Sequence, residues 1–236
     1  MTPLQPRPEH ITGLILAGGQ GLRMGGRDKG WVDWQGRPLI LHVIERLRPQ
    51  VGALMISANR ELPAYQALGY PVIPDDGATA ATAQRPDSPT PHQGPLAGLL
   101  AGLRAATTPW VALVPCDGPA FPADLVARLA SAGTDAVPRV VCRPLQPGVD
   151  EGPAPGAPAP EGWGLESVYA LVPTALAQDL AATLADGRRG VARWLARHQA
   201  RPVPFDRPGD ALAFRNMNRP DDLGRQDGSS AAKRSD

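Results

Sequence analysis

The feature that most constrains the fold is a short apolar run at residues 11–17 that ends directly at Gly18 and Gly19. Such a run is typical of a buried strand that leaves its sheet through a glycine turn. Similar runs at 51–58, 70–73 and 110–114 alternate with segments of helical spacing at 39–47, 61–68, 95–106 and 122–132. This alternation predicts an α/β fold with a mostly parallel sheet and helices on both faces.

The C-terminal third continues the pattern less regularly. Residues 135–142 resemble a strand, and Pro138 within them indicates an edge position or a bulge. We expect further elements as a strand at 166–172, helices at 175–184 and 190–198, a short strand at 203–205, an extended piece at 214–218 and a helical turn at 220–223.

Two stretches interrupt this pattern without dividing the chain. Residues 79–93 and about 144–162 are rich in proline and small residues, and both are predicted to be flexible insertions. The 236 residues suit a single domain, which we expect at 9–224, with flexible tails at 1–8 and 225–236.

Charge and composition exclude several classes of function. The 24 basic and 23 acidic residues give a net charge of +1, which favours neither nucleic acid nor a membrane as a partner. No signal peptide or membrane span is predicted. The two cysteines form no CxxC pair, so neither a disulfide framework nor a zinc site is expected, and Cys116 is interpreted as a packing residue. A cytoplasmic protein is predicted.

Lysine use singles out one position. Of the 24 basic residues two are lysines, and Lys233 lies in the polar tail, which leaves Lys29 in the folded region. A compact ammonium suits contact with phosphate as a point charge. The alternative is an ordinary surface position.

Lys29 closes a glycine-rich stretch that starts at Leu16. The amides around Gly18 and Gly19 can form a nest for phosphate oxygens, and Arg23 and Lys29 add positive charge. These groups could neutralise a triphosphate and its leaving pyrophosphate. The stretch fits neither the Walker loop nor the GxGxxG fingerprint.

Carboxylates follow two of the expected strands. Asp117 comes just after 110–114 between Pro115 and Pro119, where it can hold Mg²⁺ against triphosphate oxygens. Asp75 follows 70–73 and could contact the base or ribose of a nucleotide or join the metal shell, with Asp76 as the competing residue. The alternative for each is an aspartate that caps a turn.

The order of these motifs resembles the molybdenum cofactor guanylyltransferase family. The resemblance rests on 16–19 (LAGG), 23–26 (RMGG), Asp28-Lys29, 73–75 (IPD), 94–98 (GPLAG) and 115–119 (PCDGP). It implies a Rossmann-like fold, similar to that of nucleotide-diphospho-sugar transferases, and Mg²⁺-dependent transfer of GMP from GTP to the terminal phosphate of molybdenum-loaded molybdopterin. The pair Gly18-Gly19 favours this family over cytidylyl relatives, in which the motif usually reads Leu-Ala-Ala-Gly.

The resemblance also implies a set of site residues. Arg23, Lys29 and Asp117 are expected to be catalytic, and Asp117 is expected to contact both GTP and Mg²⁺. The expected nucleotide contacts are Leu16, Ala17, Gly18, Gly19, Lys29, Ser57, Asn59, Asp75 and Asp117. Ser57 departs from the family, which often has asparagine there, and Asn59 could take over part of its role.

The acceptor site is less defined. Arg188 and Arg189 could clamp an acceptor phosphate, although an exposed arginine pair is often only solvated surface. Asn216 and Asn218 would point to one side of an extended piece and could contact the pterin, or else serve a turn. Open alternatives are a cytidylyltransferase or sugar-phosphate nucleotidyltransferase on the same scaffold, or a non-catalytic cofactor-binding partner. Molybdoenzymes or their chaperones are possible partners.

Overall fold

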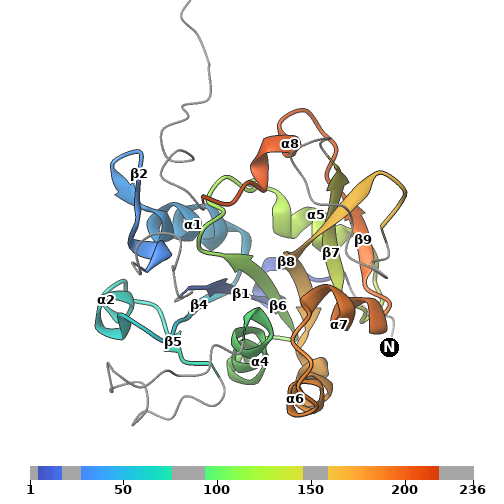
Figure 1. The fold of residues 1–236 in the computed structure, drawn as a ribbon, viewed down its shortest axis with the longest axis horizontal. Helices are drawn as coiled ribbons and strands as arrows, with labels where there is room; N and C mark the ends of the chain where they lie inside the picture. The colour runs from blue at the N-terminus through green and yellow to red at the C-terminus, as the bar shows by residue number, and fades with distance from the viewer. Residues whose placement is uncertain (1–4, 18–27, 76–93, 146–158, 218–236) are drawn as a thin grey trace, which may run out of the picture.

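One seven-stranded sheet organises the molecule (Figure 1). A computed structural model describes residues 5–17, 28–75, 94–145 and 159–217. The strand order is β5-β4-β1-β6-β8-β7-β9. In chain order the strands are β1 (Ile11–Leu16), β4 (Ala53–Ser57), β5 (Val72–Ile73), β6 (Trp110–Pro115), β7 (Arg139–Pro144), β8 (Trp163–Pro173) and β9 (Arg201–Pro204).

The sheet is mostly parallel, as predicted. Strands β5, β4, β1 and β6 run parallel to one another, and β9 runs parallel to β7. Among the described strands of this sheet, only β8 is reversed, and it pairs antiparallel with both β6 and β7. A separate hairpin joins β2 (Asp33–Trp34) to β3 (Arg37–Pro38).

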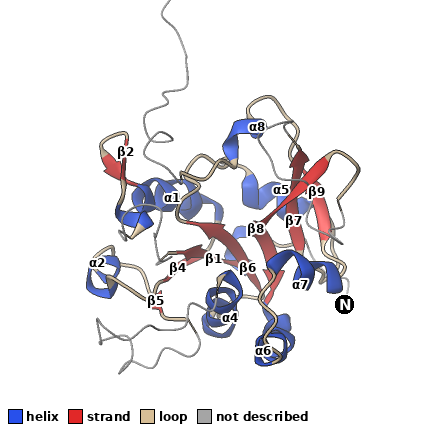
Figure 2. Cartoon of the chain, in the orientation of Figure 1, coloured by secondary structure: helices blue, strands red, loops and turns tan. Residues whose placement is uncertain are grey.

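Helices cover both faces of the sheet (Figure 2). The helices α1 (Leu39–Leu47) and α5 (Leu125–Ser131) pack on one face, and α4 (Pro95–Ala105), α6 (Ala177–Ala185) and α7 (Val191–Arg197) pack on the other. In β6, Ala112 and Val114 face the first group while Val111 and Leu113 face the second. A strand buried on both faces reads as an unbroken apolar run, which is why these strands stand out in the sequence.

Shorter helices complete the described part of the chain. They are α2 (Leu62–Gln66), α8 (Asp210–Ala213) and the 3-10 helices η1 (Pro8–His10), η3 (Lys29–Trp31), η4 (Arg48–Gln50) and η5 (Thr174–Leu176). Among the described helices, none is long and apolar enough to cross a membrane.

Some element boundaries differ from the sequence-based expectation, and proline accounts for two of them. The helix expected from 122 begins at Leu125, whose amide bonds to the Pro122 carbonyl at 3.0 Å in a preceding turn. The strand expected from 135 begins at Arg139, just after Pro138. It carries the predicted bulge, at Val140/Val141, but it lies inside the sheet because β9 covers its outer side.

The extended piece expected at 214–218 is not a strand within its described residues, 214–217. The four-residue helix α8 comes before it and was missed, because four residues are too few to display a helical period. The helical turn expected at 220–223 lies outside the described residues.

The two expected insertions relate differently to the sheet. Residues 79–93 lie outside the described residues. The second stretch connects β7 to β8, because Pro144 pairs with Trp163 and the Leu145 amide donates to the Gly162 carbonyl at 2.9 Å. One sheet therefore takes strands from before, between and after both stretches.

Candidate active site

The ends of the parallel strands bring the predicted site residues to one edge of the sheet. Leu16 is paired in register with Ser57 on one side and with Pro115 on the other, and Ser57 is paired with Ile73. The residues that follow these positions therefore leave the sheet together. Open α/β sheets bind their ligands at this carboxyl edge.

Lys29 and Asp117 meet directly at this edge. The Lys29 Nζ donates to Asp117 Oδ2 at 2.8 Å, across 88 residues of sequence. Their side chains are 23% and 14% exposed, so the pair is largely shielded but still reachable from solvent. The ammonium and the carboxylate assigned separately from the sequence thus belong to one site.

The backbone around Asp117 is fixed by two distant segments. The Met217 amide donates to the Asp117 carbonyl at 2.7 Å, and the Tyr169 hydroxyl donates to the Gly118 carbonyl at 3.1 Å. A Cβ at Gly118 would lie 1.7 Å from the Tyr169 hydroxyl, so only glycine fits there. The Asp117 carboxylate therefore projects from an anchored turn.

A second polar cluster follows β4 and β5. The Ser57 hydroxyl donates to Asp75 Oδ1 at 2.9 Å, and the Asp75 amide donates to Asn59 Oδ1 at 2.9 Å. Ser57 is buried, while Asn59 and Asp75 are partly exposed. Three predicted nucleotide contacts are thus joined in one network, with Asp75 held by the other two.

Helix α4 begins against this network. A Cβ at Gly98 would lie 2.7 Å from Ser57 Oγ, 2.8 Å from Leu16 Cδ2 and 3.1 Å from Asp75 Oδ1. Real Cβ atoms essentially never lie within 3.0 Å of such groups, so the absence of a side chain at Gly98 allows the helix to approach Ser57 and Leu16 this closely. Close packing therefore explains Gly98, the last residue of the GPLAG motif.

Cys116 is a packing residue, as predicted. It is 5% exposed and belongs to the core cluster on the α1 and α5 side of the sheet. Burial raises the pKa of its thiol well above the ordinary value, and the neighbouring Asp117 charge adds to the effect. The thiol is therefore neutral at physiological pH and is not an activated nucleophile.

For several predicted site residues the structure gives no test of the predicted contact. Gly18, Gly19, Arg23, Asp76 and Asn218 lie outside the described residues. Leu16 and Ala17 are at the site, but their backbones serve the sheet: the Ala17 amide donates to the Ser57 carbonyl, and the Leu16 carbonyl accepts from the Cys116 amide. Their contact with a nucleotide stays a prediction.

The candidate acceptor residues fall into two groups. Asn216 is next to the Asp117 turn, since a Cβ at Gly118 would lie 3.3 Å from its Oδ1. Arg188 and Arg189 are exposed on the α6–α7 connection, where Arg188 pairs with Asp186 and Arg189 donates to the Leu184 carbonyl at 2.9 Å.

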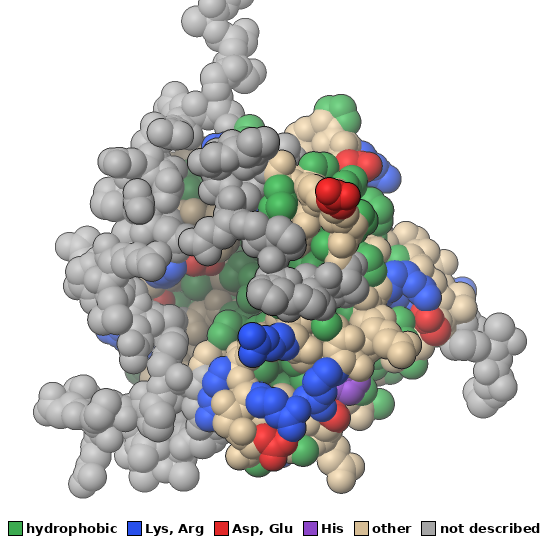
Figure 3. Space-filling model, turned by 45° about the vertical axis from the view of Figure 1, so that its right-hand side comes forward, with side chains coloured by type: hydrophobic (Ala, Val, Ile, Leu, Met, Phe, Trp, Pro, Cys, Tyr) green, Lys and Arg blue, Asp and Glu red, His purple; other side chains and the backbone are tan. Residues whose placement is uncertain are grey.

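The surface around the α6–α7 connection is basic. Exposed arginines continue from the connection into α7, and Figure 3 shows basic side chains gathered on the face turned forward. Among the described residues, Arg188 contacts Asp186 and Arg189 contacts the Leu184 carbonyl, and neither contact reaches the Lys29–Asp117 pair. The acceptor role of Arg188 and Arg189 stays a prediction.

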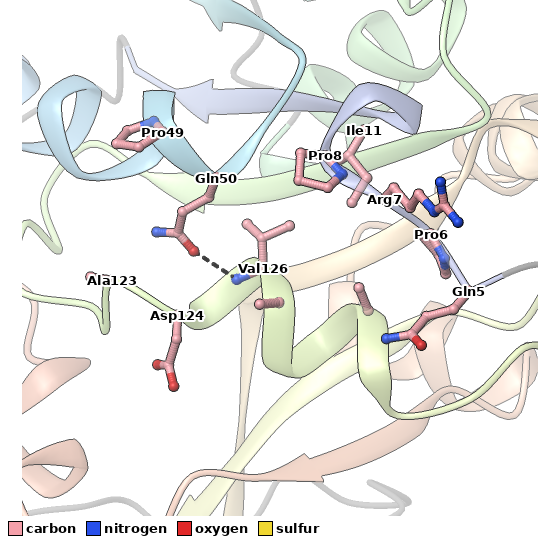
Figure 4. Close-up of a pocket in the computed structure, with 12 residues that line it drawn as sticks. Gln5, Pro6, Arg7, Pro8, Ile11, Pro49, Gln50, Ala123, Asp124 and Val126 are labelled. Carbon is pink, nitrogen blue, oxygen red and sulfur yellow. Dashed lines mark hydrogen bonds between the residues drawn. The ribbon is translucent and has the colours of Figure 1, made fainter.

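A pocket of about 600 Å³ lies elsewhere, at the opposite edge of the sheet (Figure 4). It is lined by residues including Pro8, Ile11, Gln50 and Val126, and Gln50 Oε1 accepts from the Val126 amide at 2.9 Å. Ile11 is the first residue of β1, whereas the site residues follow its last residue. This pocket is therefore separate from the candidate active site.

The donor set at the site suits one kind of metal. Among the described residues, no group of three or more His, Cys, Asp or Glu side chains could hold a metal ion. Asp117 offers a single hard carboxylate at an accessible edge. Mg²⁺ is commonly held by one or two carboxylates, with substrate phosphates and water supplying the remaining ligands, so the residues present fit it.

Sequence reasoning missed the residues that support this site. In the sequence Asp28 stands out only as part of the Asp28-Lys29 motif, and no motif includes Tyr65, Tyr169 or Met217. Tyr65 and Tyr169 are buried and reach the site through their hydroxyls. No local pattern marks such residues, because their partners lie 37 and 51 positions away.

Comparison with known proteins is consistent with this geometry. A family model described as the MobA-like NTP transferase domain matches residues 13–202. A molybdenum cofactor guanylyltransferase from Methylibium petroleiphilum is 45% identical over 219 residues, which cover 92% of this chain and 95% of that protein. One from Acidovorax sp. (strain JS42) is 44% identical, covering 88% of this chain and 90% of that protein.

Solved structures show the same fold at low sequence identity. Molybdopterin-guanine dinucleotide biosynthesis protein A from Archaeoglobus fulgidus is 20% identical with a TM-score of 0.60, covering 90% of this chain and 94% of that one. The 2-C-methyl-D-erythritol 4-phosphate cytidylyltransferase from Thermus thermophilus is 19% identical with a TM-score of 0.61, covering 89% and 94%. The predicted likeness to nucleotide-diphospho-sugar transferases is confirmed at the level of the fold.

Proposed function

Because this chain belongs to the molybdenum cofactor guanylyltransferase family, we propose that it transfers GMP from GTP to the terminal phosphate of molybdopterin. An acceptor phosphate oxygen forms a bond to the α-phosphorus of GTP, and the bond from that phosphorus to the β-phosphate oxygen breaks. Pyrophosphate leaves, and the product is a guanine dinucleotide cofactor. We place the reaction in the cytoplasm, with molybdoenzymes or their chaperones as recipients of the product.

The observation that carries this proposal is the meeting of Lys29 and Asp117 at 2.8 Å. Their pair lies at the sheet edge where β1 ends, and the Ser57–Asp75–Asn59 network lies at the same edge. A phosphate-binding cation, a metal-binding carboxylate and a polar network for the nucleoside are the groups that nucleotidyl transfer requires.

The nucleophile needs little activation. A phosphate monoester is already anionic near neutral pH, so the site needs alignment and charge neutralisation more than a general base. This agrees with the residues found, since Cys116 is a neutral packing residue and the polar groups are a cation and carboxylates.

Lys29 and Asp117 would change partners when substrate binds. The Lys29 ammonium would donate to phosphate oxygens, which withdraws it from the carboxylate. Asp117 would then hold Mg²⁺, which when bound supplies positive charge to the triphosphate and to the leaving pyrophosphate. Tyr169 and the Met217 amide keep the Asp117 turn in place during this exchange.

The nucleoside would bind on the β4 and β5 side of β1, whereas Asp117 follows β6 on the opposite side. The Ser57 hydroxyl donates to Asp75 Oδ1, which leaves Asp75 Oδ2 as the acceptor for a ribose hydroxyl or a guanine N–H. Asn59 holds the Asp75 backbone and so fixes where that oxygen lies. Gly18, Gly19 and Arg23 would complete phosphate binding, as the sequence predicts.

A nucleotide competition assay tests the proposal. Purified protein, Mg²⁺ and molybdenum-loaded molybdopterin are combined with GTP, CTP, ATP or UTP, and released pyrophosphate and dinucleotide product are measured. We expect product with GTP and little with the others. Product with CTP would support the cytidylyl alternative, and the absence of pyrophosphate with every nucleotide would support a non-catalytic binding partner.

A further inference from the structure

A buried hydrogen bond between Asp28 and Tyr65 lies directly beside Lys29. Asp28 Oδ1 accepts from the Tyr65 hydroxyl at 2.8 Å and from the Gly30 amide at 3.0 Å. Asp28 is 5% exposed and Tyr65 is fully buried. The bond to Gly30 makes Asp28 the N-terminal cap of η3, whose first residue is Lys29.

A carboxylate at this place is costly to the fold. Burial raises the pKa of the Asp28 carboxyl, although the bonds from Tyr65 and Gly30 oppose that shift. Its second oxygen, Oδ2, is buried with no partner among the described residues. A buried polar group in this position destabilises the protein unless its hydrogen bonds compensate, so each bond to Asp28 matters.

Tyr65 also restrains the other side of Lys29. A Cβ at Gly30 would lie 2.3 Å from the Tyr65 hydroxyl oxygen, so the Gly30 backbone is in close contact with it. The ring of Trp31 lies 5.2 Å from the Tyr65 ring, measured between centroids. Asp28, Gly30 and Trp31 are therefore all held by one side chain, and Lys29 lies between them.

We propose that Tyr65 is a positioning residue for Lys29 and acts through Asp28. Fixing the backbone on both sides of Lys29 limits where its flexible side chain can reach, and directs the ammonium to the Asp117 carboxylate and the phosphates beside it. Tyr65 belongs to α2, which follows the strand that carries Ser57, so α2 links the nucleoside side of the site to the phosphate side. The inference rests on the proposed function only for the role of Lys29 toward phosphate.

The first test observes Lys29 itself and needs no activity. The chain has two lysines, so protein labelled with ¹³C at the lysine ε-carbons gives signals from Lys29 and Lys233 alone, and Lys233 serves as an internal reference. In the wild type we expect the two ε-methylene protons of Lys29 to have different chemical shifts, because the side chain is held. In Tyr65→Phe the two shifts should merge, because the side chain samples several positions.

Two controls separate positioning from loss of structure. Tyr70→Phe is the same chemical change five residues away. Within the described residues the Tyr70 hydroxyl makes no hydrogen bond like that of Tyr65 to Asp28. The Lys29 signals should therefore be the same in Tyr70→Phe as in the wild type. Asp28→Asn keeps an oxygen acceptor for both donors and should preserve the Lys29 signals, whereas Asp28→Ala should not. If Tyr65→Phe does not fold, equal Lys29 signals in the two Asp28 variants would still overturn the inference, because the proposed restraint acts through the oxygen acceptor at position 28.

The second test is a double-mutant cycle on guanylyl transfer. Tyr65→Phe should lower kcat about tenfold, equivalent to about 1.4 kcal/mol of transition-state stabilisation, with little change in KM for GTP. In a Lys29→Ala background the same change should have almost no further effect on kcat, because the group that Tyr65 positions is absent.

Failure of the positioning role and failure of the proposed function would give different results. Unchanged Lys29 signals in Tyr65→Phe, or an equal loss of kcat in both backgrounds, would overturn the inference. If the Lys29 signals merge as expected but neither wild type nor variant transfers GMP, then the positioning role stands and the proposed function fails.

Discussion

At the scale of single residues, Lys29 and Asp117 are each other's partner in an ion pair. The ammonium is the cation that phosphate oxygens would take, and the carboxylate is the ligand that a metal ion would take. In the proposed reaction each partner would become available as the other is replaced, so substrate binding would separate two charges that lie 2.8 Å apart in the structure. On this proposal the pair would exchange partners during the reaction and would not act as a fixed structural bridge.

Replacing Lys29 by alanine tests that assignment. We expect the rate of GMP transfer to fall about a hundredfold or more, because developing phosphate charge loses its cation. The melting temperature should fall by only a few degrees, since the pair is partly exposed and such pairs contribute about 1 kcal/mol or less. Transfer kinetics and thermal unfolding measure the two effects.

Lys29→Arg is the matched control for charge. It keeps the positive charge and can still pair with Asp117, but its planar guanidinium presents donors in a different geometry. We expect it to retain stability and to recover only part of the rate. Full transfer activity in Lys29→Ala would exclude Lys29 from the chemistry.

At the scale of elements, α4 reaches the strand ends because Gly98 has no side chain. Gly98→Ala would favour the helix by up to about 1 kcal/mol through propensity, while the clash with Ser57, Leu16 and Asp75 would cost about 1–3 kcal/mol. The two effects on the free energy of unfolding partly cancel. The added methyl group would still push Ser57 and Asp75 out of place, so we expect KM for GTP to rise about tenfold for each 1.4 kcal/mol of strain.

Gly102→Ala controls for the general effect of a methyl group in α4. Its Cβ would lie 2.3 Å from Leu14 Cδ2, in the core and one turn further from the site. We expect it to lower stability in urea unfolding with little effect on KM for GTP. Equal changes in KM for both variants would show that α4 acts on the site only through overall packing.

Asp179 ties α6 to α7, and this tie should depend on pH. Its carboxylate accepts from His198 at 2.7 Å and from Trp194 Nε1 at 2.9 Å, and the His198 hydrogen bond is the main reason that the Asp179 pKa lies below its ordinary value of 3.8. A lowered pKa in the folded state stabilises the protein above the unfolded pKa, and this contribution is lost as the pH falls through the folded value.

The measurement compares wild type with Asp179→Asn in urea unfolding from neutral pH down to about pH 2.5. The wild type should be the more stable protein at neutral pH, and its advantage should shrink below the ordinary pKa of 3.8. A stability difference that stays constant over this range would show that the negative charge of Asp179 does not contribute.

Sequence patterns predicted the elements better than their pairing. The strands buried on both faces, such as β1 and β6, are visible in the sequence as apolar runs. Helix α1 shows a clear helical spacing of apolar residues that ends near Pro49. The antiparallel direction of β8 cannot be predicted from its own residues, because its apolar side chains would pack equally well beside a parallel or an antiparallel strand. The place of β7 inside the sheet depends on β9, which is paired with it from 62 positions away at Arg139 and Arg201.

At the scale of the whole molecule, the strand order explains why the site draws on distant segments. The chain places β4 and β5 on one side of β1 and then crosses to place β6 on the other. Ligands bind at such a switch point, outside the carboxyl ends of the strands. The sequence could predict Asp75 and Asp117 as strand-end carboxylates, but contacts such as Lys29 with Asp117 or Tyr169 with Gly118 arise only from this topology.

The same arrangement predicts that metal and nucleotide bind cooperatively. Asp117 is one carboxylate, it is paired with Lys29 in the resting site, and no cluster of three metal-binding side chains exists among the described residues. Mg²⁺ should therefore bind weakly to the protein alone, whereas GTP would provide phosphate ligands and a new partner for the ammonium. By reciprocity, Mg²⁺ should tighten GTP binding by the same factor.

Calorimetric titration of Mg²⁺ with and without GTP, corrected for Mg²⁺ binding to free GTP, measures this coupling. We expect chelation by EDTA to stop transfer and Asp117→Asn to remove the coupling. Lys29→Ala should bind Mg²⁺ more tightly than wild type in the absence of nucleotide, because the carboxylate is no longer paired. Tight Mg²⁺ binding to wild-type protein without GTP would contradict this account, since the resting ion pair would then not compete with the metal.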